Sequence, residues 1–395
     1  MSPTPLIDAQ FMQQAIRLAM RGRGDVEPNP MVGCVIVKDG RVIGQGWHRQ
    51  YGGPHAEPNA LMACTEPTAG ATAYVTLEPC CHTNKHTPPC VPQLIAARLA
   101  RIVIGCTDPN PDVAGRGIDQ LRAAGIDVDS GICQNEAKQL AAPFLLRMAG
   151  LLARPYVTLK WAQTEDGKIA GPGGVRLQIS NETSTRAIHQ LRARCDAILV
   201  GIQTVLADDP MLTARGVEPT RPLLRLVLDT NLRTPLSSKL VQSAREVPTR
   251  IDCAATYVHS EQADRLSSMG VQIGGLDFQK NGRLSLRQML SSLSPKTVSH
   301  LLVECGPTLA AGFFEQGFGD RLWVVRSPRR VEDSTAPNAA EIPSSYVATG
   351  SVELAGDTLT EYLNTESPAF FANVPSADFA RVKEQGQCDL GLSGK

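Results

Sequence analysis

The chain has 395 residues, of which 39 are acidic and 39 basic, so its formal net charge is zero. This balance argues against a nucleic-acid scaffold, which usually carries a basic excess. The first residues have no basic segment followed by an apolar one, and no apolar run approaches the roughly 18 residues of a membrane span. We therefore expect no signal peptide, no membrane partner and a cytoplasmic protein, whose eleven cysteines are reduced. The length predicts two domains.

The N-terminal half alternates helices and strands. Two strands flank a turn at Asp39-Gly40, and a helix is expected directly after His55. In chain order, the predicted elements are helix 11–20, strands 31–37 and 41–48, the helix after residue 55, strand 71–77, helix 91–100, strand 101–105 and helix 117–125. Such alternation predicts an α/β sandwich.

A domain boundary is expected near Ala153, between a long helix and a strand. The helix covers 135–153, and Arg154-Pro155 opens the strand YVTLKWA. A second α/β unit should follow, with helices at 186–195 and 308–317 and strands at 197–201, 223–229, 299–304 and 321–325. We predict domains 1–153 and 154–380, and a flexible tail at 381–395.

Two stretches suggest one metal site. They are GGPHAEPNAL, residues 52–61, and TLEPCCHTNKHTPPC, residues 76–90. A catalytic zinc takes three protein ligands from nitrogen and sulfur and keeps one position for water. His55, Cys80 and Cys90 could supply these ligands, and Glu57 could act as the base.

Nucleobase deaminases with zinc show H-x-E followed by P-C-x-x-C, with the glutamate not a ligand. Here the spacing between the cysteines is much longer. Cys81 adjoins Cys80 and is an alternative ligand, whereas His82 and His86 are weaker rivals. A deaminase acting on nucleic acid would share this pattern, but the zero net charge counts against it.

Longer motifs resemble one family, the bifunctional deaminase/reductase of riboflavin biosynthesis. In the first half they are NPMVGCVIV, TLEPC, TPPC and TDPNPDVAGRGI, and in the second RPYVTLKWAQTEDGKIA, LRARCDAILVG, TVLADDPMLT, LVLDTNLRTP and LLVECGPTLA. The resemblance implies an N-terminal cytidine-deaminase-like three-layer sandwich and a C-terminal dihydrofolate-reductase-like domain.

The resemblance also implies two reactions on small-molecule pyrimidine ribosylamine phosphates. The first is zinc-dependent hydrolytic deamination, and the second is reduction of the ribosyl group to ribityl with NADPH. One Zn²⁺ per chain, no nucleic-acid partner and a homo-oligomer are expected. The family's deaminase substrate contacts correspond to Asn29, His48, Thr87, Asp108 and Asn110, although the Asn and Asp residues would also suit turns.

For the reductase half, the resemblance implies a cofactor side and a substrate side. The cofactor side comprises Gln163, Thr204, Asp208 and Gly306, and the substrate side comprises Arg192, Leu212, Arg215 and Glu304. Lys160 and Asp166 would line the same cleft. From the residues alone, Gly306 at a helix start could present N–H groups to a phosphate or form a plain turn.

Several positions depart from the family pattern. Leu177 stands for a tryptophan, Cys305 for a glycine, and residues 327–338 for a glycine-bearing loop. His86 stands where a basic residue normally precedes TPPC, which leaves Lys85 as the candidate for the substrate phosphate. A deaminase with a degenerate second domain is therefore the alternative to a bifunctional enzyme.

Overall fold

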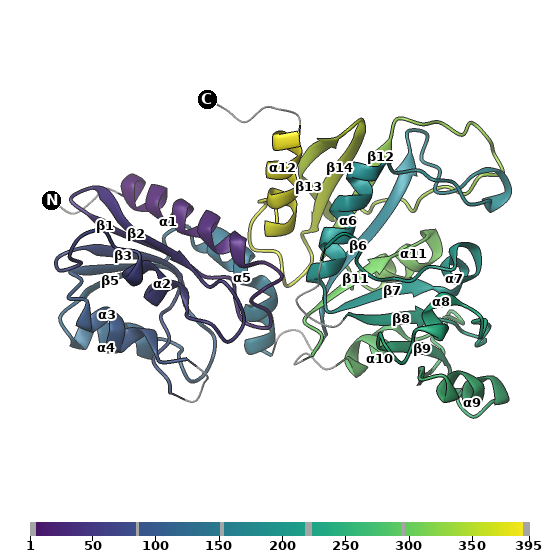
Figure 1. Ribbon diagram of the computed structural model, residues 1–395, viewed down its shortest axis with the longest axis horizontal. Coiled ribbons are helices and arrows are strands. Elements are labelled where there is room, and N and C mark those ends of the chain that lie inside the picture. The colour runs from purple at the N-terminus through teal and green to yellow at the C-terminus, as the bar shows by residue number, and fades with distance from the viewer. Residues whose placement is uncertain (1–4, 84–86, 151–153, 218–222, 294–296, 390–395) are drawn as a thin grey trace. The chain divides into compact units, whose positions relative to one another are not determined.

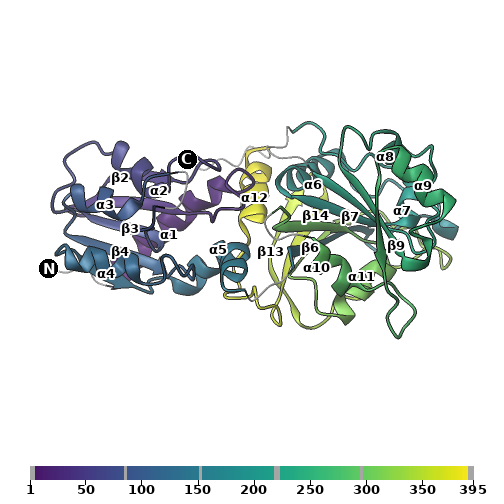
Figure 2. The ribbon, with the colours of Figure 1, turned by 90° about the horizontal axis from the view of Figure 1, so that it is seen from below.

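The structure is a computed structural model that describes residues 5–83, 87–150, 154–217, 223–293 and 297–389 (Figures 1 and 2). The chain forms two compact units. Residues 1–152 together with 376–381 make unit 1, and residues 153–375 together with 382–395 make unit 2. Among the described residues, no helix combines the length and the apolar character that a membrane span requires.

Unit 1 contains a five-stranded sheet with the order β2-β1-β3-β4-β5. Its strands are β1 (Gly33–Lys38), β2 (Arg41–Trp47), β3 (Thr72–Leu77), β4 (Arg101–Cys106) and β5 (Asp127–Ser130). Strand β1 pairs antiparallel with β2 and β3, whereas β3, β4 and β5 are parallel. Strands β2, β3 and β4 therefore end at the same edge of the sheet.

Helices cover both faces of this sheet (Figure 1). They are α1 (Pro5–Ala19), the 3₁₀ turn Met20–Gly22, α2 (Ala56–Met62), α3 (Cys90–Ala96), α4 (Arg116–Ala123) and α5 (Gln134–Met148). Successive side chains of β1 point to opposite faces of the sheet. Val35 packs with α1 residues such as Met12, whereas Ile36 packs with Ala60 of α2 and Leu94 of α3. This arrangement is the predicted three-layer sandwich.

Helix α2 lies very close to strand β2. A Cβ atom added at Gly46 would overlap the backbone of Ala60 in α2, so only glycine permits this approach. The contact fixes the start of α2, where His55 and Glu57 are found.

Unit 2 contains a nine-stranded sheet with the order β10-β9-β8-β7-β11-β6-β12-β14-β13. The strands are β6 (Tyr156–Thr164), β7 (Ala197–Gly201), β8 (Leu224–Leu228), β9 (Thr249–Ala254), β10 (Gln272–Leu276), β11 (His300–Glu304), β12 (Arg321–Ser327), β13 (Tyr346–Leu354) and β14 (Asp357–Asn364). Neighbouring strands are parallel from β10 to β12, and the last two pairs are antiparallel.

The helices that accompany this sheet mostly connect parallel strands, because parallel neighbours must be joined by a crossover segment. They are α6 (Glu182–Arg194), α7 (Ile202–Asp208), α8 (Lys239–Gln242), α9 (Glu261–Ser268), α10 (Leu286–Ser292), α11 (Pro307–Glu315) and two 3₁₀ turns, Pro172–Gly174 and Ala255–Tyr257.

The C-terminal segment differs from the flexible tail predicted for 381–395. Helix α12 runs from Ala377 to Asp389, and its first residues belong to unit 1 rather than to the second domain. The physical reason is burial. Asp378 and Phe379 are fully buried, and Val382 is 2% exposed. Residues 390–395 lie outside the described part of the chain.

Candidate functional site

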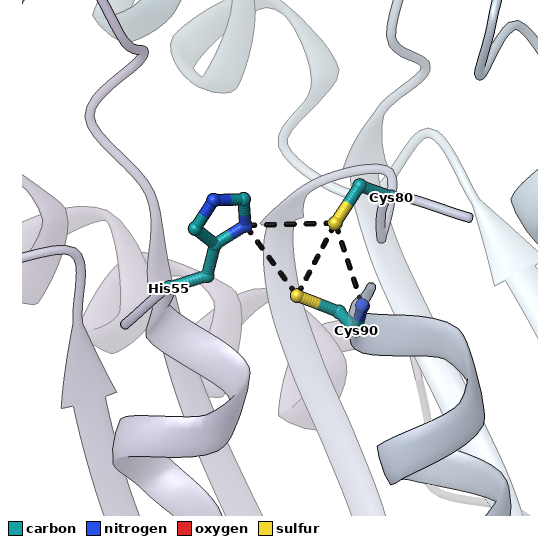
Figure 3. A group of neighbouring side chains, drawn as sticks. All are labelled: His55, Cys80 and Cys90. Carbon is teal, nitrogen blue, oxygen red and sulfur yellow. Dashed lines mark hydrogen bonds between the residues drawn. The ribbon is translucent and has the colours of Figure 1, made fainter. Parts of the chain in front are cut away.

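Three side chains from separate elements of unit 1 form a compact cluster (Figure 3). His55 immediately precedes α2, Cys80 follows β3, and Cys90 is the first residue of α3. His55 Nδ1 lies 3.5 Å from Cys80 Sγ and 3.4 Å from Cys90 Sγ, and the two sulfur atoms are 3.4 Å apart. Histidine nitrogen and cysteine sulfur are the ligands that zinc prefers. Among the described residues, this is the group whose donor atoms could hold a metal ion.

The orientation of His55 suits metal coordination. Its Nδ1 faces both sulfur atoms, while its Nε2 lies 3.2 Å from Thr87 Oγ1. A hydrogen on Nε2 can be donated to this hydroxyl, which leaves the Nδ1 lone pair for a cation. Thr87 therefore contacts the cluster as well as lining the adjacent cavity.

The alternative sulfur ligand points elsewhere. Cys81 Sγ lies 3.6 Å from the carbonyl oxygen of Asp112 and is outside the cluster. His82 lines the neighbouring cavity, and its buried Nδ1 has no hydrogen-bond partner among the described residues. Lys85 and His86 lie outside the described residues.

Glu57 is buried beside this cluster, with 3% of its surface exposed. It occupies the first turn of α2, so its carboxylate lies at the positive end of the helix. Burial raises the pKa of this carboxyl above its ordinary value, and Cys80 adds to the rise, whereas His55 opposes it. A carboxylate with a raised pKa is better suited to accept a proton near neutral pH.

A cavity of about 270 Å³ opens beside the cluster. Its lining contains all five residues that the sequence predicts as deaminase substrate contacts, together with Glu57. The lining residues are Asn29, Pro30, Val32, His48, Tyr51, Gly52, His55, Glu57, Leu77, Glu78, Cys80, His82, Thr87, Asp108, Asn110, Phe144, Arg147 and Met148.

Hydrogen bonds fix the tautomer of His48, which is 2% exposed. Its Nδ1 lies 3.0 Å from the carbonyl oxygen of Pro54, which can only accept, so Nδ1 carries the hydrogen. In the neutral ring Nε2 then accepts, and the side-chain amide of Asn29 is 3.2 Å away to donate. Asn29 and His48 therefore hold one another at the cavity wall.

Asp108 and Asn110 form turns and line the cavity as well. Asp108 Oδ1 accepts a hydrogen bond from the backbone N–H of Asn110 at 2.9 Å, and Asn110 Oδ1 accepts one from Asp112 at 3.0 Å. Asp108 and Asn110 thus both form turns and line the cavity, so the two interpretations of these residues are compatible.

Glu78, which was not predicted from the sequence, holds the loop that contains Asp108 through hydrogen bonds. Its buried carboxylate accepts backbone N–H groups of Asp108, Gly115, Gly117 and Ile118 at 3.1 to 3.4 Å. These donors include the first turn of α4, where a carboxylate is favourable. A glutamate between a buried strand and a proline is the signal that could have revealed it.

Arg147, Phe144 and Tyr51 also line the cavity and were not predicted. Arg147 is in the last turn of α5, donates Nη2 to the carbonyl oxygen of Pro28 at 2.7 Å, and lies over the Phe144 ring. Among the described lining residues, it is the only arginine or lysine. No local motif distinguishes it from an ordinary surface arginine.

In unit 2, two predicted substrate residues pair with each other. Arg192 Nε and Nη2 donate to the two carboxylate oxygens of Glu304 at 2.6 and 2.7 Å. Burial alone would raise the pKa of Glu304, but Arg192 and the neighbouring Lys160 lower it to about 2. Lys160 is the register partner of Glu304 in β6, and burial lowers the pKa of its ammonium group.

The cofactor residues predicted for unit 2 follow three neighbouring strands. Gln163 is near the end of β6, Thr204 and Asp208 are in α7 directly after β7, and Gly306 follows β11 and precedes α11. Since β7, β11 and β6 are adjacent and parallel, these residues lie along one edge of the sheet. Ligands of open α/β sheets bind at this carboxyl edge.

The other reductase residues have local partners. Gln163 Oε1 accepts from Trp161 Nε1 at 2.7 Å, and Asp208 pairs with Arg176 at 3.0 Å. Arg215 packs on His189, with its Nε 3.2 Å from the ring.

Leu212 and Asp166 complete the predicted positions. Leu212 is 1% exposed and has a φ of 53°, so its side chain belongs to the core. Asp166 accepts from the backbone of Val331 and Glu332, which ties the β6 turn to the 327–338 loop.

Comparisons with known proteins agree with both units. The family described as the cytidine and deoxycytidylate deaminase zinc-binding region matches residues 6–106, and the RibD C-terminal domain matches residues 155–335. The riboflavin biosynthesis protein RibD of Aquifex aeolicus is 41% identical over 323 residues, which cover 82% of this chain and 87% of that protein. The Escherichia coli protein is 41% identical over 325 residues, covering 82% and 88%.

Solved structures give the same result over nearly the whole chain. Acinetobacter baumannii RibD, form 1, has a TM-score of 0.73 and 34% identity and covers 92% of this chain and 100% of that one. A Thermotoga maritima protein has a TM-score of 0.74, 30% identity and the same coverage. It is described as a diaminohydroxyphosphoribosylaminopyrimidine deaminase/5-amino-6-(5-phosphoribosylamino)uracil reductase.

The fold and the site thus define a deaminase of the zinc-binding class joined to a reductase domain. The chain belongs to the RibD family of riboflavin biosynthesis and is a bifunctional deaminase and reductase. The resemblance seen in the sequence is confirmed.

The Arg192–Glu304 pair predicts a pH-dependent stability. Because the pKa of Glu304 is lowered to about 2, the pair stabilises unit 2 fully above the unfolded pKa near 4.5, and the contribution is lost as pH falls from there toward 2. Its size is on the order of 3 kcal/mol. Glu304→Gln should therefore lower the urea midpoint strongly at pH 6, and the deficit should shrink by pH 3. A deficit that stays constant with pH would contradict this assignment.

Proposed function

We propose that unit 1 deaminates 2,5-diamino-6-(5-phosphoribosylamino)pyrimidin-4(3H)-one and that unit 2 then reduces the ribosyl chain of the product to ribityl 5-phosphate with NADPH. The observation that carries the first step is the cluster of one histidine and two cysteines next to a buried carboxylate in a cavity. The Thermotoga maritima relative is described as having the same two activities.

His55, Cys80 and Cys90 would hold one Zn²⁺ per chain, since their donor atoms already lie within 4.8 Å of one another. Three protein ligands leave one tetrahedral position open to water, as in catalytic zinc sites. When bound, the metal would lower the pKa of that water toward about 7.

Glu57 would move the protons of the reaction. It takes one from the attacking water, whose oxygen bonds to the amine-bearing ring carbon, and gives one to the amino group, which leaves as ammonia when the C–N bond breaks. One water is consumed and one ammonia is released. Burial, which raises the pKa of Glu57, suits both transfers.

The cavity wall would orient the substrate. Asn29, His48, Thr87, Asp108 and Asn110 would contact the pyrimidine and ribose groups, and their positions around one cavity support this assignment. Arg147 would face the phosphate, because a guanidinium binds phosphate oxygens in a bidentate manner and the other charged lining groups are carboxylates.

In unit 2, Gln163, Thr204, Asp208 and Gly306 would bind NADPH along the carboxyl edge of the sheet. Arg192, Arg215 and Glu304 would face the substrate on the same edge, and Leu212, whose side chain is buried, would contribute its backbone. A hydride from NADPH and a proton from solvent convert the ribosyl group to ribityl. The position of these residues along one edge of the sheet supports this assignment. Because Cys305 stands where the family has a glycine, the binding of NADPH is the part of the proposal that most needs a test.

The two activities can be separated with one substrate. The full-length protein given the diaminopyrimidinone phosphate should release ammonia without NADPH, and with NADPH its product mass should increase further by two hydrogens. Glu57→Gln should retain zinc but release ammonia at least a hundredfold more slowly, because general acid–base catalysis is lost.

Glu182→Gln is the matched control, because its side chain is 92% exposed on α6. Ammonia release by Glu57→Gln at the control rate would reject the catalytic role. Ammonia release without any NADPH-dependent product would favour a degenerate second domain.

Arg147→Gln tests the phosphate assignment. The specificity constant for the phosphorylated substrate should fall about 10- to 100-fold, as expected for a lost charge-assisted hydrogen bond. Turnover of the dephosphorylated analogue should change little. The matched control is Arg122→Gln, since Arg122 also donates Nη2 to a backbone carbonyl but lies outside the cavity lining. A loss of phosphate discrimination in Lys85→Gln, with none in Arg147→Gln, would reassign the contact.

A further inference from the structure

We propose that Asp378, at the start of α12, is a positioning residue of the deaminase cavity and acts through Arg23. This inference rests on the proposed deamination. It assigns a role in the first reaction to the C-terminal segment, which follows the last strand of the reductase sheet. Helix α12 lies outside both ranges matched by the two families, 6–106 and 155–335.

A buried ionic group links α12 to the N-terminal part of the chain. Arg23 Nε donates to Asp378 Oδ1 and Oδ2 at 3.3 and 3.2 Å, and Arg23 Nη1 donates to Glu27 at 2.5 Å. All three residues are buried: Arg23 is 5% exposed, Asp378 0% and Glu27 6%. Removing one partner of a buried ionic group leaves an uncompensated charge in the interior and strongly destabilises the fold. The three side chains are therefore held in one defined arrangement.

The same residues hold the loop that forms one wall of the cavity. Glu27 also accepts the backbone N–H of Gly24 at 2.9 Å, which closes the loop on itself. The next residue, Pro28, accepts from Arg147, and Asn29 follows with its contact to His48. Asn29, His48 and Arg147 all line the cavity.

A second connection runs from this loop to the segment of the cavity wall that contains His48 and Tyr51. The backbone N–H of Tyr51 donates to the carbonyl oxygen of Asp25 at 2.8 Å. A Cβ at Gly22 would contact the carbonyl oxygen of His48 at 2.5 Å, so the two segments are in direct contact. A shift of Arg23 would therefore be transmitted to His48 and Tyr51 as well as to Asn29.

Apolar packing holds Asp378 in place. Phe379 is fully buried, and Ala377 belongs to the core cluster that includes Met12, Val26 and Met31. The first turn of α12 thus completes the core of unit 1 beneath the cavity loop. The metal ligands come from other elements, namely the residue before α2, the loop after β3, and α3.

This separation predicts a specific kinetic signature. In the full-length protein, Asp378→Ala should raise the KM for deamination about tenfold while kcat changes less than threefold and the zinc content stays at the parent value. The physical reason is that the substrate contacts on the loop move, whereas the ligands and Glu57 do not. Asp378→Glu should restore most of the affinity because it keeps the charge.

The matched control is Glu384→Ala, an exposed acidic residue of the same helix. If Asp378→Ala does not fold, Asp378→Asn, which keeps the shape, gives the same test with a smaller KM increase. An unchanged KM, an equal fall in kcat, a loss of zinc, or no recovery in Asp378→Glu would overturn the proposal. Failure of the proposed deamination is distinguishable, because then the parent protein itself releases no ammonia.

Discussion

The structure of the deaminase site depends on one constraint, the convergence of His55, Cys80 and Cys90 on a common point. Strands β2, β3 and β4 end at the same sheet edge, and the segments that follow them carry these residues and the loop with Asp108. The donor atoms therefore lie within 4.8 Å although the residues are up to 35 positions apart. Glu57 lies beside the three ligands because α2, whose first turn contains it, begins at the same edge of the sheet.

Polar contacts in the cavity wall hold this arrangement. Thr87 orients the His55 ring, Pro54 fixes the tautomer of His48, and Glu78 collects four backbone N–H groups of the Asp108 loop. Each contact aims a side chain that faces the cavity, as the residues around metal and substrate sites commonly do.

Much of this could be predicted from the sequence because the signals are local. The alternation of strands and helices predicts an α/β sandwich, and H-x-E with two later cysteines indicates the site. Contacts between distant segments gave no such signal. Arg147 and Asp378 look like surface residues until the fold brings them to Pro28 and Arg23. Residues from 381 read as a tail because polar and charged residues predominate there, and the burial of Val382 is set by contacts that have no local sequence signal.

The zinc content of the purified protein and of two cysteine variants tests the three-ligand site most directly. We predict one zinc per chain in the parent, a content well below one in Cys90→Ser, and an unchanged content in Cys81→Ser. A parent protein without zinc, or loss of zinc in Cys81→Ser but not in Cys90→Ser, would contradict this assignment of the ligands.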